Sequence, residues 1–194
     1  KVSSSGTHTA VTGRSGLDKT ALLTPLEINK AVTTLKKLGA KPINGKYVAI
    51  IHPSVSFDLR NSDGWVESHK YAAVTEIFNG EIGELHGVRF VESNNAKVFN
   101  DSTCPVKTAA SDGNPAVHYS VYPTLFFGKG AFRMIDPEGG NLEMIVKNKG
   151  EIGGPLDQFS TVGYKAEMAT KIVYEDRMVR VESCSSYSET DEAN

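Results

Sequence analysis

The chain has 194 residues, which is enough to bury a substantial core without disulfides or metals. Its net charge is −2 and its pI is about 6.2, so no global excess of positive charge is present to hold nucleic acid by its phosphates. This balance argues against a dedicated DNA-binding module.

Cysteine usage and hydropathy narrow the class of protein further. Cys104 and Cys184 lie far apart and in no CxxC pair, which favours two free thiols over a zinc site. No apolar run approaches the ~20 residues of a membrane span and no secretory leader is recognisable, so we expect a soluble, intracellular protein. Because the chain begins at Lys1 and not at methionine, we expect it to be the core of something longer.

The N-terminal part predicts a flexible lead-in followed by a helix. Residues 1–19 are rich in serine, threonine and glycine and contain few apolar side chains. The helix is predicted over 25–38, because Thr24 can cap it, Pro25 suits its first position and Glu27 can bond back to the cap. Gly39 should end it. One apolar stripe is expected from Ile28, Ala31, Val32, Leu35 and Leu38.

The next segment predicts a buried strand and two helices. The β-rich apolar run Tyr47–Ile51 is typical of a strand that is buried on both faces, and His52-Pro53 should end it. A short helix is predicted over Ser54–Leu59 and a second one over Trp65–Ile77. Trp65, as a lone tryptophan, is expected to be a core or interface anchor.

Residues 80–93 carry the most distinctive local pattern of the chain. Three glycines within the first eight residues permit positive φ angles and predict a compact turn that leads into a strand. In that strand Val88 and Phe90 should face one way, and Arg89 and Val91 the other.

The middle of the chain predicts a surface excursion and then a return to the core. Residues 94–117 are polar and irregular, with a turn signal at Asp112–Pro115. Residues 122–134 are apolar again and 142–146 resemble another strand, so we expect both to contribute to the core.

The C-terminal part allows two interpretations. From Ser160 to Ile172, apolar residues at even positions alternate with polar ones, which favours a long strand. A helix stays open, because Val162, Ala166, Ala169 and Val173 also fit a helical stripe, although Gly163 disfavours it. After this segment we predict a turn at 175–177, a returning strand over 178–182 and a free acidic tail over 185–194.

The search for chemistry finds no common catalytic, nucleotide-binding or metal motif, and no cofactor is expected. The histidines at 52, 69, 86 and 118 match no metal spacing, so ordinary hydrogen-bonded roles are favoured. Glu81 and Glu84 could in principle act as acid and base, and with His86 they define an alternative hydrolytic site. Pairing with turn amides and with a positive group is the favoured role for both carboxylates.

Several segments, taken in order, resemble the major capsid proteins of tailed bacteriophages, in the branch typified by the phage N-four capsid protein. They cover most of 24–183 and are the predicted helix, Ala40–Pro53, Trp65, Gly80–Ser93, Val121–Gly128, Ser160–Ala166 and Met178–Ser183. The resemblance implies an α+β chain with the Hong Kong ninety-seven capsid fold, in which an axial domain with a central sheet adjoins a peripheral domain with a spine helix and long strands.

The resemblance also implies a division of the chain. Residues 25–38 would be the spine helix and 159–183 the long strands, within a peripheral domain made of 20–46 and 136–184. Residues 47–135 would be the axial domain. In this family an N-terminal arm and an extended loop precede the spine helix, and residues 1–19 are too few and too polar to supply them. We therefore expect a fragment that cannot build a closed shell.

The implied function is that of a structural subunit of an icosahedral phage head, which is made in the bacterial cytoplasm and is not an enzyme. Its implied partners are copies of itself, other virion proteins and, without sequence-specific contact, the packaged DNA; no membrane is implied. The candidate subunit contacts are Glu81, Glu84, Arg89, Lys165, Arg177 and Arg180. The alternatives are a hydrolytic enzyme with a site near Glu81, Glu84 and His86, or a virion decoration or tail protein.

Overall fold

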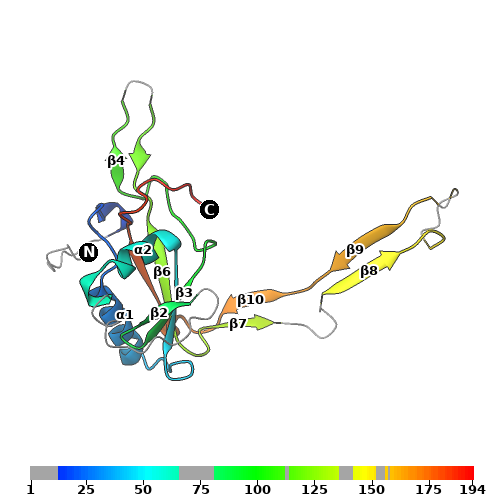
Figure 1. Ribbon diagram of the computed structural model, residues 1–194, viewed down its shortest axis with the longest axis horizontal. Coiled ribbons are helices and arrows are strands. Elements are labelled where there is room, and N and C mark those ends of the chain that lie inside the picture. The colour runs from blue at the N-terminus through cyan, green and yellow to red at the C-terminus, as the bar shows by residue number, and fades with distance from the viewer. Residues whose placement is uncertain (1–12, 66–80, 112–113, 136–141, 152–155, 157) are drawn as a thin grey trace. The chain divides into compact units, whose positions relative to one another are not determined.

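The computed structural model describes residues 13–65, 81–111, 114–135, 142–151, 156 and 158–194 (Figure 1). They form two compact units. The first holds the described residues up to Lys129 and from Asp176 onward, and the second holds those within Gly130–Glu175. The first unit carries α1, α2 and a five-stranded sheet, and the second is a long β-hairpin.

Helix α1 spans Pro25–Lys37, which confirms the predicted helix. Its C-terminal end is a Schellman motif, because Gly39 has a φ of +74° and the amide of Ala40 donates to the carbonyl of Leu35 at 2.9 Å. The predicted cap by the Thr24 side chain is wrong, because that side chain makes no capping bond. Glu27 accepts a hydrogen bond from Lys30 at 3.1 Å.

Four of the five predicted stripe residues of α1 are buried: Ile28, Ala31, Val32 and Leu35. Leu38 is the exception, with 49% of its surface exposed. It lies at the C-cap, where the backbone has left the helical conformation, so the helical period no longer places its side chain against the core.

Strand β1 (Tyr47–Ile51) and helix α2 (Pro53–Arg60) also form as predicted. In β1, Tyr47, Ala49 and Ile51 are buried, whereas the alternate side chains are only half-buried. The prediction that both faces of this strand are buried is therefore correct for one face only. His52 caps α2, because its Nδ1 accepts a hydrogen bond from the amide of Ser54 at 3.2 Å. The second predicted helix lies almost entirely outside the described residues.

The sheet of the first unit has the strand order β11-β6-β1-β3-β2. Its other strands are β2 (Glu81–Leu85), β3 (Val88–Glu92), β6 (Tyr122–Phe127) and β11 (Met178–Ser183). Strand β1 runs parallel to β3 and antiparallel to β6, and the remaining pairs are antiparallel. Alternate side chains of these strands and the apolar face of α1 form one core, in which Trp65 and Phe90 make an edge contact with 5.8 Å between ring centroids.

The predicted compact turn over 80–87 is in fact a β-hairpin. Residues 81–85 form β2, and the turn is confined to His86 and Gly87, both of which have positive φ angles, as a tight two-residue hairpin turn requires. Gly83, with a φ of 136°, lies at a bulge in β2. The predicted facing of β3 is confirmed, because Val88 and Phe90 are fully buried and Arg89 is exposed.

Both ends of the first unit are more ordered than predicted. Residues 13–19 include a 3-10 turn at Arg14–Gly16 and are tied to the sheet, so only 1–12, which lie outside the described residues, could still form the expected lead-in. The predicted free tail over 185–194 is wrong, because its side chains bond to α2, β6 and the segment after β3. These partners are remote in sequence, and composition alone gives no sign of them.

The predicted surface excursion contains a small exposed hairpin. Strand β4 (Val106–Thr108) pairs with β5 (Val117–His118), and most of the side chains of the two strands are exposed. Residues 112–113 of the predicted turn lie outside the described residues.

The second unit consists of two successive antiparallel ladders of one hairpin (Figure 1). Strand β7 (Phe132–Ile135) pairs with β10 (Ala169–Ile172), and β8 (Glu143–Lys147) pairs with β9 (Thr161–Lys165). The strand interpretation of 160–172 is therefore correct and the helical one is wrong, although the strand is broken in two.

The two compact units are not the predicted axial and peripheral domains, whose assignment stays a prediction. Residues 25–37 and 178–183 of the predicted peripheral domain lie in the same unit as 47–51 of the predicted axial domain, and β11 is hydrogen-bonded to β6 along its whole length. The expected return of 132–134 and 142–146 to the core is wrong, because these residues belong to the exposed hairpin.

Candidate assembly surface

The second unit, called the arm from here on (residues 130–175), has one regular apolar face. In the ladder of β8 and β9, Met144 lies directly opposite Tyr164, and Val146 lies opposite Val162. Directly opposed residues of an antiparallel pair share a face, and so do alternate residues of one strand. These four side chains therefore form a two-by-two group, called the apolar arm face.

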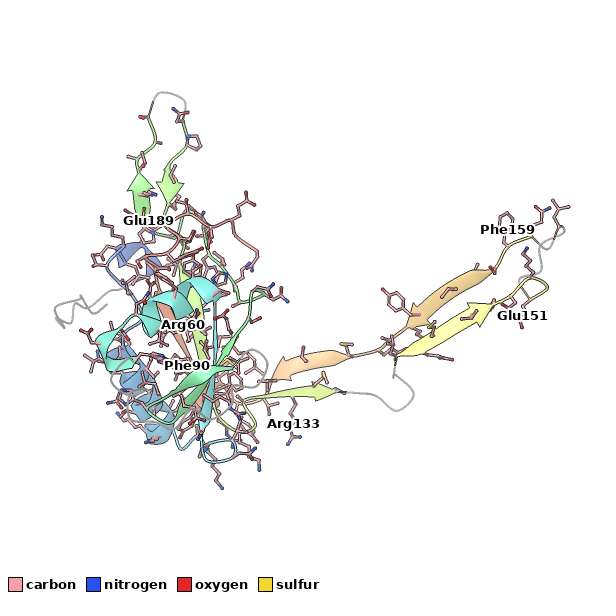
Figure 2. All side chains as sticks on the ribbon, viewed as in Figure 1. Arg60, Phe90, Arg133, Glu151, Phe159 and Glu189 are labelled. Atoms are coloured by element: carbon pink, nitrogen blue, oxygen red, sulfur yellow. The ribbon has the colours of Figure 1, made fainter. Side chains whose placement is uncertain are left out.

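The apolar arm face is open to solvent in this chain. The exposed fractions are 70% for Met144, 49% for Val146, 70% for Val162 and 82% for Tyr164. Figure 2 shows the side chains of β8 and β9 standing off the ribbon, with Glu151 and Phe159 toward the end of the hairpin remote from β7 and β10. Among the described residues, fifteen of the twenty-one exposed large apolar side chains lie in the arm, which is therefore the main apolar surface of the described chain.

The opposite face of the same ladder is mostly polar. Glu143 lies opposite Lys165, and Lys147 lies opposite Thr161. Lys165 also forms an ion pair with Glu167 at 3.1 Å. In the second ladder, Arg133 lies opposite Lys171, and like charges that face each other directly weaken a strand pair. Ordering of the arm therefore gains little from its polar face.

The predicted contact residues of the first unit lie partly together. Glu84 and Arg89 are opposite each other in the pair of β2 and β3, and the Glu84 carboxylate forms an ion pair with Lys46. This pairing with a positive group is the favoured role in the sequence interpretation. Glu81 lies at the start of β2, and its side chain is outside the described structure.

The other predicted contact residues lie elsewhere and also have partners within the chain. Arg177 donates to the carbonyl of Lys129 at 3.2 Å, and the Nε of Arg180 lies 3.2 Å from a carboxylate oxygen of Glu182. Lys165 belongs to the arm, and the other five residues belong to the first unit. The role of all six in subunit contacts stays a prediction.

A small hollow lies near one residue of the alternative hydrolytic site. Its volume is about 110 Å³, whereas ligand pockets usually measure about 300–1,000 Å³, and its lining includes Lys46, the ion-pair partner of Glu84. His86 lies exposed in the hairpin turn. The lining residues of the hollow are Ile43, Asn44, Lys46, Val48 and Arg89.

Arg14 is an anchor that the sequence interpretation missed. Its guanidinium donates two hydrogen bonds to the Glu182 carboxylate, at 3.0 and 2.9 Å, and a third to the Thr103 hydroxyl at 2.9 Å. It also lies 3.7 Å from the ring centroid of Phe99. The hydrogen bond and charge of Glu182 raise the pKa of Arg14. The Arg14 side chain thus links the N-terminal segment to β11, and no local sequence pattern indicates this link.

A second missed cluster surrounds Asp191 in the C-terminal segment. The Asp191 carboxylate accepts hydrogen bonds from the hydroxyls of Tyr122 (2.6 Å), Ser54 (3.4 Å) and Ser188. Burial raises the pKa of Asp191, but the bonds from Ser188 and Tyr122 outweigh it, so the net pKa lies below its ordinary value. Burial lowers the pKa of His52, whose ring stacks on Tyr122 with 4.9 Å between centroids.

The cysteines are free, as predicted, and both are buried. Both pack with Val121 in a small apolar cluster, and burial raises the pKa of Cys184 to about 12, so its thiol stays protonated at neutral pH. Within the part of the chain that the structure describes, no three His, Cys, Asp or Glu side chains are grouped to hold a metal ion. No described helix is both long and apolar enough to cross a membrane.

The sequence model of the phage capsid protein family matches residues 26–134, more than half of the chain. The chain belongs to this family. The match covers α1 and most of the sheet and ends within β7, so the remainder of the arm lies beyond it. A comparison with curated proteins finds no match.

Solved capsid structures share the fold of this phage capsid family member. The capsid of Ralstonia phage GP4 matches 95% of this chain and 52% of its own, at 17% identity and a TM-score of 0.60. The capsid of Cyanophage Pam1 matches 89% of this chain and 50% of its own, at 15% identity and a TM-score of 0.58. The chain therefore has an α+β phage capsid fold and spans about half the length of these capsid chains.

The fold is also shared with the holo-SrpI encapsulin complex of Synechococcus elongatus PCC 7942. That structure matches 94% of this chain and 57% of its own, at 11% identity and a TM-score of 0.52. Similarity at this level shows the fold alone. The assignment to phage capsid proteins thus rests on the family match, and the predicted N-four branch stays a prediction.

Proposed function

We propose that this chain is part of a structural subunit of a phage head, and that it acts by repeated self-association and not by turnover. Membership of the phage capsid protein family is the observation that carries the proposal. The capsid structures that share its fold support it, as does the concentration of exposed apolar side chains in the arm.

The energetics of the arm suit an assembly of many copies. Fully burying one side chain of this kind contributes about 1.5–3 kcal/mol, whereas association of two chains costs an estimated ~4–15 kcal/mol. A face of four such side chains therefore supports only a weak contact between two chains. In a closed symmetric shell each copy makes several contacts at once, and weak contacts add up to a stable particle.

The same proposal includes a location and partners. The subunit would be made in the cytoplasm of the bacterial host and reside in the virion, beside other virion proteins. The inner side of the shell would face packaged DNA without sequence-specific contacts, which suits a net charge of −2. The axial and peripheral domains are defined by their positions in an assembled shell. The assignment of residues of this chain to the two domains therefore stays a prediction.

Light scattering and electron microscopy test the proposal. The longest natural form of the protein should form large closed particles at micromolar concentration. The 194-residue chain alone should stay small, because it spans about half of the matched capsid chains. Failure of the natural form to assemble under any condition that supports its folding would contradict the proposal. Closed particles from the 194-residue chain would contradict the predicted fragment behaviour only.

A further inference from the structure

We propose that a group of basic side chains at one end of the five-stranded sheet, called the basic end, is a contact surface for the phosphate backbone of double-stranded DNA. The proposal rests on the proposed function, which supplies packaged DNA as a neighbour, and adds the surface of the chain that meets it. The basic end lies in the first unit and consists of Lys36, Lys37, Lys41, Lys46, Lys129 and Arg177.

Three segments that are remote in sequence bring these cations together. The start of β1, the end of β6 and the start of β11 lie at one end of the sheet. There the amide of Lys129 donates to the carbonyl of Lys41 at 2.8 Å, and the guanidinium of Arg177 donates to the carbonyl of Lys129 at 3.2 Å. Lys36 and Lys37 belong to the last turn of α1, which ends shortly before Lys41. The group is therefore held together by backbone contacts, and not by sequence proximity alone.

The basic end carries more positive charge than its carboxylates neutralise. Glu84 forms an ion pair with Lys46, and Asp176 precedes Arg177 in the chain. Within the part of the chain that the structure describes, no ion pair involves the other four lysines of the group, and all four are exposed. A local excess of positive charge therefore faces solvent at this end of the sheet.

Cations near the other end of β11, where the strand finishes, are matched by carboxylates. Arg14 bonds to Glu182 there, and Lys107 forms an ion pair with Glu189 at 2.7 Å. The charge of the first unit is thus distributed unevenly, and the net charge of −2 for the whole chain does not reveal the excess at the basic end. A weak contact with phosphates is compatible with that net charge, because salt screens more distant charges beyond about 10 Å at ~0.1 M.

The dipole of α1 explains only part of the group. Cations in the last turn of a helix are favourable beside its unsatisfied carbonyls, which gives Lys36 and Lys37 a role within the chain. Lys41 and Lys129 lie outside the helix, so the dipole does not explain them. Their backbones are in direct contact, so two like charges are held on neighbouring segments, and an external anion would relieve their repulsion.

The side chains at the basic end suit a duplex backbone better than single-stranded DNA. Proteins that bind single strands use exposed aromatic side chains on which the bases stack. In the described part of the first unit, the exposed Phe, Tyr and Trp side chains are Phe57 and Tyr187, and these contact each other beside α2, with 5.2 Å between ring centroids. Lysines bind phosphates as point charges and do not read the base sequence through them. The expected contact is therefore weak, independent of sequence and dependent on salt.

Fluorescence anisotropy with a labelled DNA duplex of about 20 base pairs tests the basic end in the 194-residue chain. Four phosphate contacts would lower the affinity by on the order of a hundredfold between about 50 and 200 mM salt. Lys41→Glu combined with Lys129→Glu should weaken binding about tenfold or more at the lower salt concentration. Lys19→Glu combined with Lys97→Glu makes the same change in net charge at exposed positions away from the basic end, and should weaken binding less than about threefold.

Acetylation of lysine amines, read by mass spectrometry, locates the contact in the unsubstituted chain. Duplex DNA should slow the reaction at Lys41 and Lys129 several-fold and leave the reaction at Lys19 and Lys97 unchanged. Urea unfolding followed by Trp65 fluorescence checks that both double variants fold.

Equal losses of affinity in the two double variants, equal protection of all four lysines, or no binding of the duplex at about 50 mM salt would overturn the inference. Tighter binding of polyglutamate than of DNA would also overturn it and would assign the surface to an acidic protein. Displacement of the duplex by inorganic phosphate, but not by chloride at equal ionic strength, would assign the surface to free phosphate instead. Each of these results leaves the proposed function standing, because particle formation by the longest natural form tests that function separately.

Discussion

Asp191 is the centre of the bonds that hold the C-terminal segment in place. Its carboxylate accepts bonds from Ser54, Tyr122 and Ser188, and its backbone carbonyl accepts two more, from Asn100 and Ser120, at 2.8 Å each. The segment has a polar composition, so hydrogen bonds to one charged group carry a large part of its local stability.

We expect Asp191→Asn to lower the free energy of unfolding at pH 7 by about 1–3 kcal/mol, because it weakens hydrogen bonds to a charged acceptor. The folded pKa of Asp191 lies below the unfolded value of about 3.9. The stabilisation by its charge is therefore present above that pH and is lost as the pH falls through the folded pKa. The variant should lose less stability than the parent below about pH 4.

Thermal unfolding followed by Trp65 fluorescence from neutral to acid pH measures this difference. Glu192→Gln, at the exposed neighbouring position, is the matched control and should behave like the parent. His52 affects stability at higher pH. Because burial lowers the pKa of His52, stability falls as the pH drops below its unfolded value of about 6.5. This fall should be larger in Asp191→Asn, because the Asp191 charge partly offsets the effect of burial on the pKa of His52. An identical acid response in both variants would contradict the role of Asp191.

At the scale of elements, the backbone at the end of β6 packs closely against the loop after α1. A Cβ atom at Gly128 would lie 2.7 Å from the carbonyl oxygen of Lys41 and 3.3 Å from the Cβ of Ala40. The same carbonyl accepts a bond from the amide of Lys129 at 2.8 Å, and the amide of Gly128 donates to Arg177 at 3.0 Å. The backbone on both sides is therefore held in place.

We expect Gly128→Ala to destabilise the first unit by about 1–3 kcal/mol, because the added methyl group needs a backbone shift. Gly13→Ala is the control, since nothing lies within 4 Å of its Cβ position, and it should change stability by less than about 0.5 kcal/mol. Urea unfolding followed by Trp65 fluorescence measures both. Equal stability of the two variants would contradict this prediction, because it would show that the loop after α1 shifts at little energetic cost.

At the scale of the whole chain, the two units differ in how they are supported. The first has a core that includes Val88, Phe90 and Phe126, all fully buried, whereas the strands of the arm have only exposed side chains. Local stability follows the density of buried apolar contacts, so the units should open independently.

We predict that backbone amides of β8 and β9 exchange hydrogen much faster than those of β1 and β6 in the 194-residue chain. Hydrogen exchange read by mass spectrometry measures this difference, and the peptides of β1 and β6 serve as internal controls. In assembled particles the exchange of β8 and β9 should slow down. Equal protection of all four strands in the isolated chain would contradict the independence of the units.

Local patterns in the sequence were sufficient where an element is determined by its own residues. Pro25 and Gly39 bracket α1, and the alternation of Val88, Arg89 and Phe90 reports which face of β3 is buried. The same alternation predicts strands in the arm. It does not say whether the apolar side of a strand meets its own chain or another one, which is why the arm was expected in the core.

The sequence alone determined the α+β class, the positions of α1, β1, α2, β3 and β11, and the resemblance to phage capsid proteins, because these depend on short-range periodicity, turn residues and the order of segments. Only the tertiary structure decided that β11 completes the sheet, that Arg14 and Asp191 fasten the two ends, and that the arm exposes one apolar face. Each of these depends on contacts between residues far apart in the chain, and spacing along a sequence does not encode such contacts.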